Sequence, residues 1–211
     1  QHSEHKRNLD VIALIDYGIG NLRSVAKALS AVGGDVRLTA DPDHVLAASK
    51  VVLPGVGAFG DGMAGLRERH LIETLKTVVA RQTPLLGICL GMQLLFEASD
   101  ELGSHDGLGF LPGRVRRFPP GDLKIPQTGW NQILLDQDSP LLRGLEPGSY
   151  AYYNHSYHCD PADPADVLAS TEYGIRYASV VGCGRLYGVQ FHPEKSQWVG
   201  LAILRNFVEA C

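Results

Sequence analysis

One cysteine lies in a segment whose residue types and spacing are typical of a catalytic nucleophile. Cys89 lies between Gly87 and Gly91, directly after the apolar run 85–88 and directly before a helical pattern. Such a strand–nucleophile–helix turn forces the nucleophile into strained backbone angles, and the flanking glycines relieve crowding by neighbouring side chains. The N–H groups at the start of the helix favour thiolate over thiol and can stabilise an oxyanion, with the Leu90 N–H as the first donor. The alternative is a core cysteine between two packing glycines.

A histidine and a carboxylate farther along the chain supply the partners that such a thiol needs. The short apolar strand 188–191 ends in His192-Pro193-Glu194, 103 residues after Cys89. A thiol nucleophile needs a base within hydrogen-bond reach and a third group that orients the base. Residues i and i+2 of an extended segment point to the same side, so His192 and Glu194 can act together. Alone the segment fits a surface turn equally well, but together with the cysteine turn it predicts a Cys–His–Glu triad.

Strands and helices alternate through the first half of the sequence and would position the cysteine. Short apolar runs predict strands at 11–15, 35–39, 50–53 and 85–88. Helical spacing predicts a helix capped by Asn21 and ended by Gly33-Gly34, and further helices at 42–48, 65–80 and 90–98. This alternation predicts an α/β fold with a doubly wound, mostly parallel sheet and helices on both faces.

The second half of the sequence has a different character. Residues 107–188 contain many Gly, Pro and Tyr residues in short alternating runs, which predicts antiparallel strands added to the sheet. A C-terminal helix is expected at 196–210. Residues 9–211 are therefore predicted to form a single domain, and the polar segment 1–8 to be a disordered lead-in or a cloning remnant.

Composition excludes several classes of function. The chain of 211 residues is 45% hydrophobic and 20% charged, with a formal net charge of -4 and no basic block, which argues against nucleic acid or an anionic membrane surface as partner. No apolar run approaches the roughly 20 residues that cross a bilayer. The four cysteines fit no metal spacing and are expected to stay reduced in the cytoplasm. Neither a metal nor a cofactor is expected.

Two segments resemble the paired signatures of the class I glutamine amidotransferases, whose fold is flavodoxin-like. They are Gly-Ile-Cys-Leu-Gly-Met-Gln at 87–93 and Gln-Phe-His-Pro-Glu at 190–194. The resemblance implies that L-glutamine is hydrolysed to glutamate and ammonia through a γ-glutamyl thioester, and that the ammonia passes to a synthase partner. By matching position, Cys89 is the nucleophile, His192 the general base and then acid, and Glu194 the group that orients the imidazole. Gln93 matches a residue that contacts glutamine.

Three further segments resemble one family within this class, the glutaminase subunits of imidazole glycerol phosphate synthases in histidine biosynthesis. They are 16–22 (DYGIGNL), 53–57 (LPGVG) and 129–131 (GWN), and the likeness extends from about Val11 to the C-terminal helix. The resemblance implies a heterodimer with a (β/α)₈-barrel cyclase. The cyclase receives ammonia through its interior and makes imidazole glycerol phosphate and an aminoimidazole carboxamide ribotide.

The resemblance also implies roles for residues outside the triad. The Pro54-Gly55-Val56-Gly57 loop resembles a gate, whose glycines let a peptide N–H swing towards or away from the oxyanion at low cost; alternatively it is an ordinary strand-ending turn. The backbone at Ser156 and Tyr157 would hold the amino-acid end of glutamine. Asn21 and Trp130 would lie near the cyclase interface, although helix capping and packing explain them as well. His155 and His158 are interpreted as polar strand residues.

One segment departs from the family pattern, and three rival functions remain open. Pro126-Gln127-Thr128 stands where the family usually has Pro-His-Met, and Gln127 cannot titrate near neutral pH. The rivals are the glutaminase subunit of pyridoxal phosphate synthase, a non-catalytic protein of the same fold, and a cysteine protease. The first normally carries a Gly-Gly-Glu-Ser segment, where this chain has Pro-Gly-Val-Gly. Without a partner we expect the chain to be nearly inactive.

Overall fold

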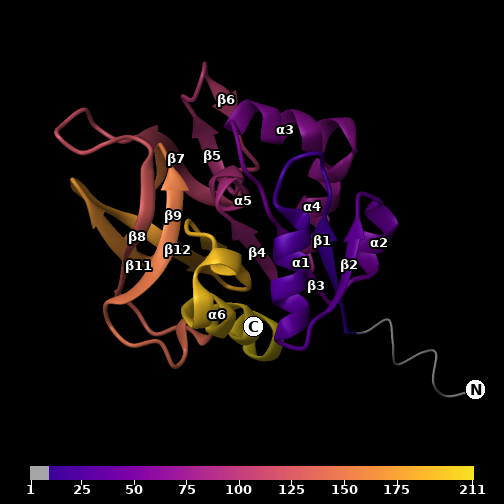
Figure 1. The fold of residues 1–211 in the computed structure, drawn as a ribbon. Helices are drawn as coiled ribbons and strands as arrows, with labels where there is room; N and C mark the ends of the chain where they lie inside the picture. Colours follow the sequence, from indigo (N-terminus) through magenta and orange to yellow (C-terminus); the bar gives the residue numbers. More distant parts are fainter. Residues whose placement is uncertain (1–9) are drawn as a thin grey trace, which may run out of the picture.

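The centre of the fold is a sheet of parallel strands (Figure 1). The computed structural model describes residues 10–211, and the predicted lead-in 1–8 lies outside the described residues. Five parallel strands are adjacent in the order β2-β1-β3-β4-β13, a flavodoxin-like order. Their bounds are β1 Val11–Ile15, β2 Asp35–Thr39, β3 Lys50–Leu53, β4 Leu85–Ile88 and β13 Leu186–Val189.

Helices cover both faces of the parallel strands, which explains why these strands are apolar without alternation. The two on one face are α1 (Leu22–Ala31) and α6 (Gln197–Ala210). Those on the other are α2 (Pro42–Ala47), α3 (Phe59–Glu68) and α4 (Leu71–Ala80). Within β1, Leu14 packs in the core beneath α1 and α6, and Ile15 packs in the core on the opposite face.

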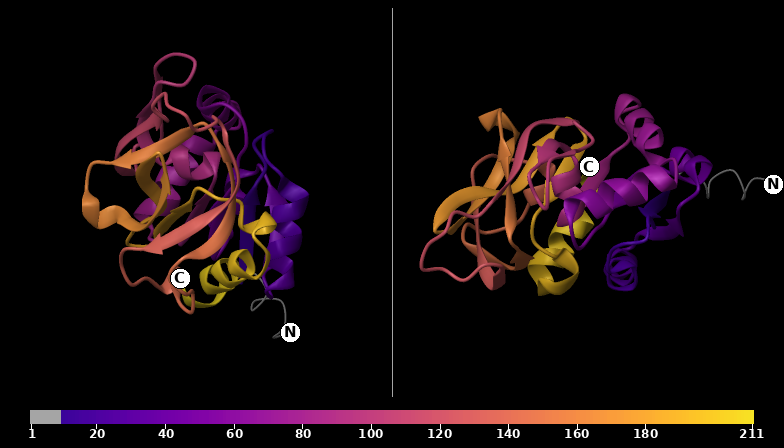
Figure 2. Two further views of the ribbon diagram at one scale, coloured as in Figure 1. Left: turned by 60° about the vertical axis from the view of Figure 1, so that its left-hand side comes forward. Right: turned by 90° about the horizontal axis from the view of Figure 1, so that it is seen from above.

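Antiparallel strands extend the sheet beyond β13, as the second half of the sequence predicts. The sheet continues from β13 through β12, β10, β7 and β5 to β6, and a branch runs from β12 through β11 and β8 to β9. Figure 2 shows these added strands, coloured magenta to yellow-orange along the chain, beside the indigo-to-purple strands β1 to β3. The bounds are β5 Phe96–Ser99, β6 His105–Asp106, β7 Leu111–Arg117, β8 Gln127–Leu135, β9 Ser149–His155, β10 Tyr157–Pro161, β11 Val167–Tyr173 and β12 Ile175–Cys183. Three short 3₁₀ turns are η1 (Pro140–Leu142), η2 (Pro164–Asp166) and η3 (Pro193–Lys195). Together the two halves confirm the predicted fold class.

Two predicted helices differ from the observed ones. The helix expected at 65–80 is two helices, α3 and α4, because His70 adopts left-handed angles (φ 56°) and interrupts the spiral. The start of α3 was missed because glycines weaken the helical signal. One of them, Gly65, is required because a Cβ there would collide with the Tyr17 carbonyl oxygen.

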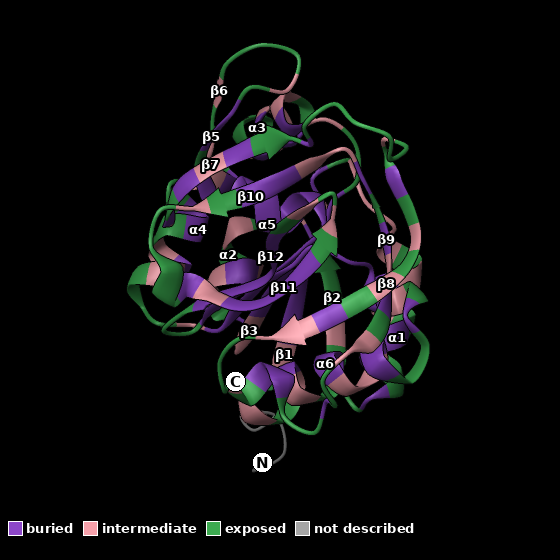
Figure 3. Ribbon diagram, turned by 90° about the vertical axis from the view of Figure 1, so that its left-hand side faces the viewer, coloured by how far each residue is buried: buried purple, intermediate pink, exposed green. Residues whose placement is uncertain are grey.

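The helix expected at 90–98 is shorter than predicted. It ends as α5 at Leu90–Leu94, and the following residues form β5, which pairs with β6 and β7. Strand pairing outweighs the local helical pattern here, since tertiary context overrides propensity. Figure 3 shows the central strands mostly buried, whereas exposed and less exposed residues alternate along β8 and β9. No helix within residues 10–211 is long and apolar enough to span a bilayer.

Candidate active site

Cys89 lies at the carboxyl end of β4 in a strained turn. Its backbone angles are φ 55° and ψ −112°, in the region that L-residues avoid. A Cβ on Gly87 would lie 2.6 Å from the Gly91 carbonyl oxygen, and a Cβ on Gly91 would collide with the Leu53 carbonyl oxygen. The two glycines therefore let β4, α5 and the end of β3 approach closely enough to form the turn.

The strand β13 places the histidine beside the cysteine. Val189 pairs in parallel with Ile88, and the Cys89 N–H donates to the Val189 carbonyl oxygen at 2.8 Å. Three residues later, the His192 N–H donates to the Tyr152 carbonyl oxygen at 2.9 Å. The Ser196 hydroxyl donates to the His192 carbonyl oxygen at 2.6 Å and accepts from the Tyr152 N–H at 2.9 Å. The backbone of His192 is thus held on both sides.

The structure brings the imidazole of His192 between Cys89 and the carboxylate of Glu194. Glu194 Oε1 accepts from His192 Nδ1 at 2.9 Å, so that Nε2 is the nitrogen left for the sulfur. Glu194 has a side chain only 1% exposed, and its Oε2 has no hydrogen-bond partner among the described residues. Burial lowers the pKa of His192, but the hydrogen bonds and charges of Cys89 and Glu194 outweigh it and raise this pKa to about 10. A protonated imidazole beside the sulfur is the form that favours a thiolate.

A buried amide that the sequence analysis gave no role contacts the sulfur. Gln190 Nε2 lies 3.8 Å from Cys89 Sγ, and Gln190 Oε1 accepts from Gln93 Nε2 at 3.2 Å. Gln93 Nε2 also donates to the Tyr157 carbonyl oxygen at 3.1 Å. Because Gln190 is two residues before His192 on an apolar strand, the rule that i and i+2 share a side could have identified it.

The predicted contribution of the helix dipole is small, since α5 has only five residues.

The glycine loop after β3 accepts a hydrogen bond from the Leu90 N–H, the predicted oxyanion donor. The Leu90 N–H donates to the Gly55 carbonyl oxygen at 3.2 Å, so it is not free for a substrate oxygen. Val56 is 41% exposed, and Gly57 has φ 100° with open space where a side chain would be. This is the arrangement expected of an oxyanion loop turned away from the site.

A cavity of about 420 Å³ opens at Cys89 and collects most of the predicted site residues. Its walls include the thiol and imidazole of the triad, Leu90, the loop and the substrate-binding positions, namely Val56, Gly57, Cys89, Leu90, Gln93, Ser156, Tyr157 and His192. Glu101 also lines it, accepts from the Phe59 N–H at 3.0 Å, and has a pKa that burial raises. Glu101 is not predicted from the sequence, because a helix that continues to residue 98 would not return the following segment to the site.

Asn21 and Trp130 lie outside the cavity lining. Asn21 occupies the N-cap position of α1, but its side chain makes no capping hydrogen bond, so the predicted cap is wrong in this respect. Trp130 is 47% exposed, and its ring packs edge-on against Tyr152. The Tyr152 ring in turn lies 6.5 Å from the His192 ring, between centroids. Trp130 is thus a half-exposed aromatic separated from the His192 imidazole by one ring.

His155, His158 and Gln127 are buried. His155 Nδ1 lies 2.6 Å from the Tyr157 carbonyl oxygen, and burial lowers the pKa of His155 to about 4. His158 Nδ1 lies 3.3 Å from the Cys159 carbonyl oxygen. Gln127 Oε1 accepts from the Tyr177 hydroxyl at 3.2 Å, and Gln127 Nε2 has no partner among the described residues. His155 stays neutral near pH 7, which fits a polar strand residue rather than a second base.

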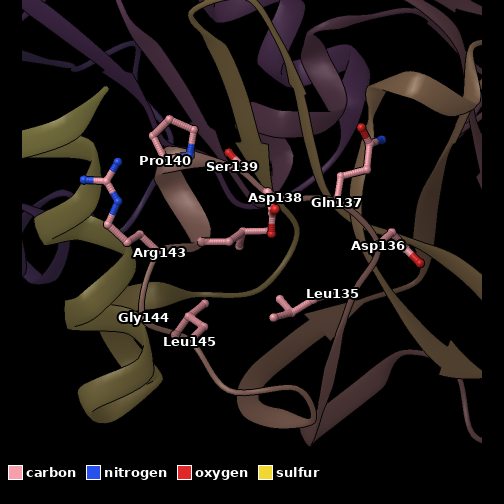
Figure 4. Close-up of a pocket in the computed structure, with 10 residues that line it drawn as sticks. Leu135, Asp136, Gln137, Asp138, Ser139, Pro140, Arg143, Gly144 and Leu145 are labelled. Carbon is pink, nitrogen blue, oxygen red and sulfur yellow. The ribbon is translucent and has the colours of Figure 1, made fainter.

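A larger hollow of about 700 Å³ lies along residues 135–145 and is separate from the triad (Figure 4). Its most prominent carboxylate, Asp136, is already paired with Arg176 at 2.7 Å and accepts from the Ser170 hydroxyl at 2.7 Å. None of the predicted site residues lines it. The predicted site residues that line a cavity therefore line the smaller one, at Cys89.

Known proteins resemble this chain over almost its whole length. The family described as "Glutamine amidotransferase class-I" matches residues 13–211. The "Imidazole glycerol phosphate synthase subunit HisH" of Moorella thermoacetica is 50% identical over 198 residues, which cover 94% of each chain. The protein of the same name from Methanosarcina mazei is 50% identical over 202 residues, which cover 95% of this chain and 98% of the relative.

Solved structures agree with this assignment at the level of the fold. A structure described as "Crystal structure of glutamine amidotransferase" aligns with a TM-score of 0.74 at 19% identity, covering 93% of this chain and 97% of the other. "Structure of PurLQS from Thermotoga maritima" aligns with a TM-score of 0.73 at 18% identity, covering 93% and 96%. With the family match over residues 13–211, the chain belongs to the class I glutamine amidotransferase family.

Proposed function

We propose that this chain is the glutaminase subunit of an imidazole glycerol phosphate synthase and hydrolyses L-glutamine to L-glutamate and ammonia. The observation that carries the proposal is the contact of Cys89, His192 and Glu194 at the ends of two adjacent parallel strands, beside an amino-acid-sized cavity. The half-identical relatives named as synthase subunits support the same reaction and its place in histidine biosynthesis.

The proposed reaction follows from the contacts of the triad. The Cys89 thiolate attacks the side-chain carbonyl carbon of glutamine, which forms a C–S bond and places negative charge on the oxygen. His192 Nε2–H gives its proton to the amide nitrogen, and ammonia leaves with a γ-glutamyl thioester remaining. His192 then takes a proton from water as the water attacks the thioester. The tetrahedral species expels the thiolate, which releases glutamate and restores the protonated imidazole.

The cavity walls suggest how glutamine is held. The carboxylate of Glu101 is suited to the α-ammonium group, since an opposite charge offsets the cost of burying either group. Gln93 and the backbone at Ser156 and Tyr157 supply hydrogen-bonding groups for the rest of the substrate. Glutamine would thereby present its amide to Cys89.

The resting loop predicts regulation by the partner. While the Gly55 carbonyl oxygen accepts from the Leu90 N–H, the substrate oxyanion lacks that donor. The chain alone is therefore nearly inactive. Two states of the loop are relevant: the resting one and one in which the Gly55 carbonyl oxygen no longer accepts from the Leu90 N–H. A ligand on the cyclase raises activity if it binds the second state more tightly, because only differential affinity shifts such an equilibrium.

The partner in this proposal is a (β/α)₈-barrel cyclase that forms a heterodimer with the chain near Asn21 and Trp130 and receives the ammonia. We also propose that residues 9–211 work as a single domain, because one sheet joins the strands of both halves. The place of action is the cytoplasm, where Cys89 stays reduced.

Glutamate release is the measurement that tests the proposal. It is followed with the chain alone, with cyclase, and with cyclase plus its nucleotide ligand. Cys89→Ala is expected to abolish release, and Glu194→Gln to lower kcat by about 10²–10⁴-fold. Cys183→Ala, at an exposed cysteine, is the control and should retain activity. Release that ignores the cyclase, or survives Cys89→Ala, would contradict the proposal.

A further inference from the structure

The oxyanion loop consists of a packed half and an open half. Its start is held against the nucleophile turn, because a Cβ on Gly91 would collide with the Leu53 carbonyl oxygen and lie 3.3 Å from the Pro54 carbonyl carbon. Its end is open, since a Cβ on Gly57 would meet nothing within 4 Å. The start of the loop is therefore less free to move than its end.

A buried tyrosine holds the packed half from the other side. Tyr17 follows β1 and is 1% exposed, and its hydroxyl donates to the Pro54 carbonyl oxygen. A Cβ on Gly55 would collide with the Tyr17 hydroxyl oxygen and lie 3.0 Å from Leu90 Cβ. Gly55 is thus enclosed between Tyr17 and Leu90.

The hydroxyl of Tyr17 keeps its proton at every pH at which the enzyme works. Burial raises the pKa of Tyr17, and the neighbouring charge of Cys89 raises it further. A protonated phenol can donate to the carbonyl, whereas a phenolate cannot. The contact with the Pro54 carbonyl therefore does not depend on ionisation of the phenol near neutral pH.

We propose that Tyr17 is a positioning residue for the oxyanion loop, whose hydroxyl fixes the Pro54–Gly55 peptide so that only the Gly55–Val56 peptide turns. The inference rests on the proposed glutaminase function. The Pro54 carbonyl belongs to the peptide before Gly55, and the carbonyl that occupies the Leu90 N–H belongs to the peptide after it. Rotation about the two bonds that flank the second peptide withdraws the Gly55 carbonyl and presents the Val56 N–H, with the first peptide unmoved.

Loss of the hydroxyl has a specific consequence. The Pro54 carbonyl loses its donor, so the first peptide gains freedom, and the loop has more orientations in which no N–H faces the oxyanion. The thiol, His192 and the glutamine-binding groups keep their contacts. The stabilisation of the transition state is therefore reduced, while substrate binding and the reactivity of the thiol are unchanged.

The test compares Tyr17→Phe with wild type in the complex with cyclase and its nucleotide ligand. We expect kcat for glutamate release to fall about tenfold, with KM for glutamine and the rate of Cys89 alkylation by iodoacetamide within twofold. Affinity for glutamate γ-semialdehyde, an aldehyde that forms an oxyanion on the thiol, should fall about tenfold. Tyr173→Phe is the matched control, because the Tyr173 hydroxyl also donates to a backbone carbonyl, that of Lys124, and it should retain wild-type kinetics.

A second variant reaches the same contact from the loop. Gly55→Ala places a methyl group against the hydroxyl of Tyr17, and the same loss of kcat with unchanged alkylation is expected. Wild-type kcat in either variant would overturn the proposal, as would an equal loss of kcat and alkylation rate in Tyr17→Phe. A complex in which wild type releases no glutamate, or Cys89→Ala remains active, would instead refute the proposed function.

Discussion

At the scale of single residues, the sulfur of Cys89 is surrounded by side-chain donors. The amide of Gln190 and the imidazole of His192 both contact it. Gln190 is fully buried, and its orientation is fixed by Gln93. A buried donor held in this way stabilises a charged acceptor more than a neutral one.

Replacing Gln190 should therefore weaken the thiolate. In Gln190→Leu, which keeps a similar volume, we expect kcat/KM for glutamine to fall about tenfold and Cys89 to need a higher pH for alkylation. The readouts are glutamate release in the activated complex and the pH dependence of iodoacetamide labelling. Gln132→Leu, at an exposed glutamine of β8, should leave both unchanged. An unaltered labelling profile in Gln190→Leu would show that the amide does not stabilise the thiolate.

The triad and Gln93 could be predicted from the sequence, whereas Glu101 could not. Cys89 and His192 each stand beside glycines or proline in a pattern that few structural roles require. Glu101 has no such local signal. It reaches the cavity because the chain turns into β5 after α5, and that turn depends on pairing with β6 and β7.

At the scale of elements, the turn at Cys89 depends on the close approach of α5 and the end of β3. The glycines involved fall into two kinds. Gly91 has no room for a side chain, whereas Gly57 has room but a backbone conformation with φ 100°. Steric collision and conformational strain can therefore be compared within one site.

The two glycines should respond differently to alanine. Gly57→Ala should lower the free energy of unfolding by about 1 kcal/mol, the usual cost of a side chain at positive φ. Gly91→Ala should cost more than about 3 kcal/mol or prevent folding, because the backbone of Leu53 cannot move aside. Urea denaturation measures both, with Gly109→Ala as a control at positive φ in open space. Equal costs for Gly57 and Gly91 would contradict the packing described.

Element types were predictable where the pattern was long or strongly apolar. The strands β1 to β4 and α6 match the predictions closely, since their burial is visible in the sequence, whereas β13 begins and ends two residues before the predicted strand 188–191. The break between α3 and α4 at His70 was not predictable. The left-handed conformation of this histidine depends on the packing of the helices on either side of it.

At the scale of the whole molecule, the branch of the sheet buries His155 against several rings. Its neighbours are Phe118, Tyr153 and Tyr177, and the positively charged forms of His158 and His192 lower its pKa in addition to burial. Folding therefore opposes protonation of this imidazole.

Acid should weaken the fold through His155. Below pH 6.5 the unfolded chain protonates this residue, while the folded chain does not until about pH 4, so stability falls as pH falls between these values. The largest contribution is about 3 kcal/mol. His192, whose pKa is raised to about 10, contributes no slope in this window because its stabilisation is lost only as pH rises above 6.5. Urea denaturation from pH 4.5 to 7 should show a flatter dependence for His155→Gln than for wild type. Equal slopes would exclude the effect.

Trp130 is expected to anchor the synthase partner. Trp130→Ala should weaken binding to the cyclase by about 2 kcal/mol, because exposed aromatics often dominate interfaces, and should change stability by less than about 0.5 kcal/mol. Isothermal titration measures the first and thermal unfolding the second. Leu38→Ala, equally exposed at the far end of the sheet on β2, is the matched control. Equal affinities for wild type and Trp130→Ala would place the interface elsewhere.

The position of β13 has a consequence for the newly made protein. This strand lies in the middle of the sheet, between β4 and β12, yet within residues 10–211 it is the last strand of the sheet to be synthesised. Until it inserts, the edge of β4 is open and Cys89 has neither His192 nor Gln190 beside it. The proposed triad is therefore incomplete until β13 is in place, and the open edge of β4 is a site at which another strand can pair.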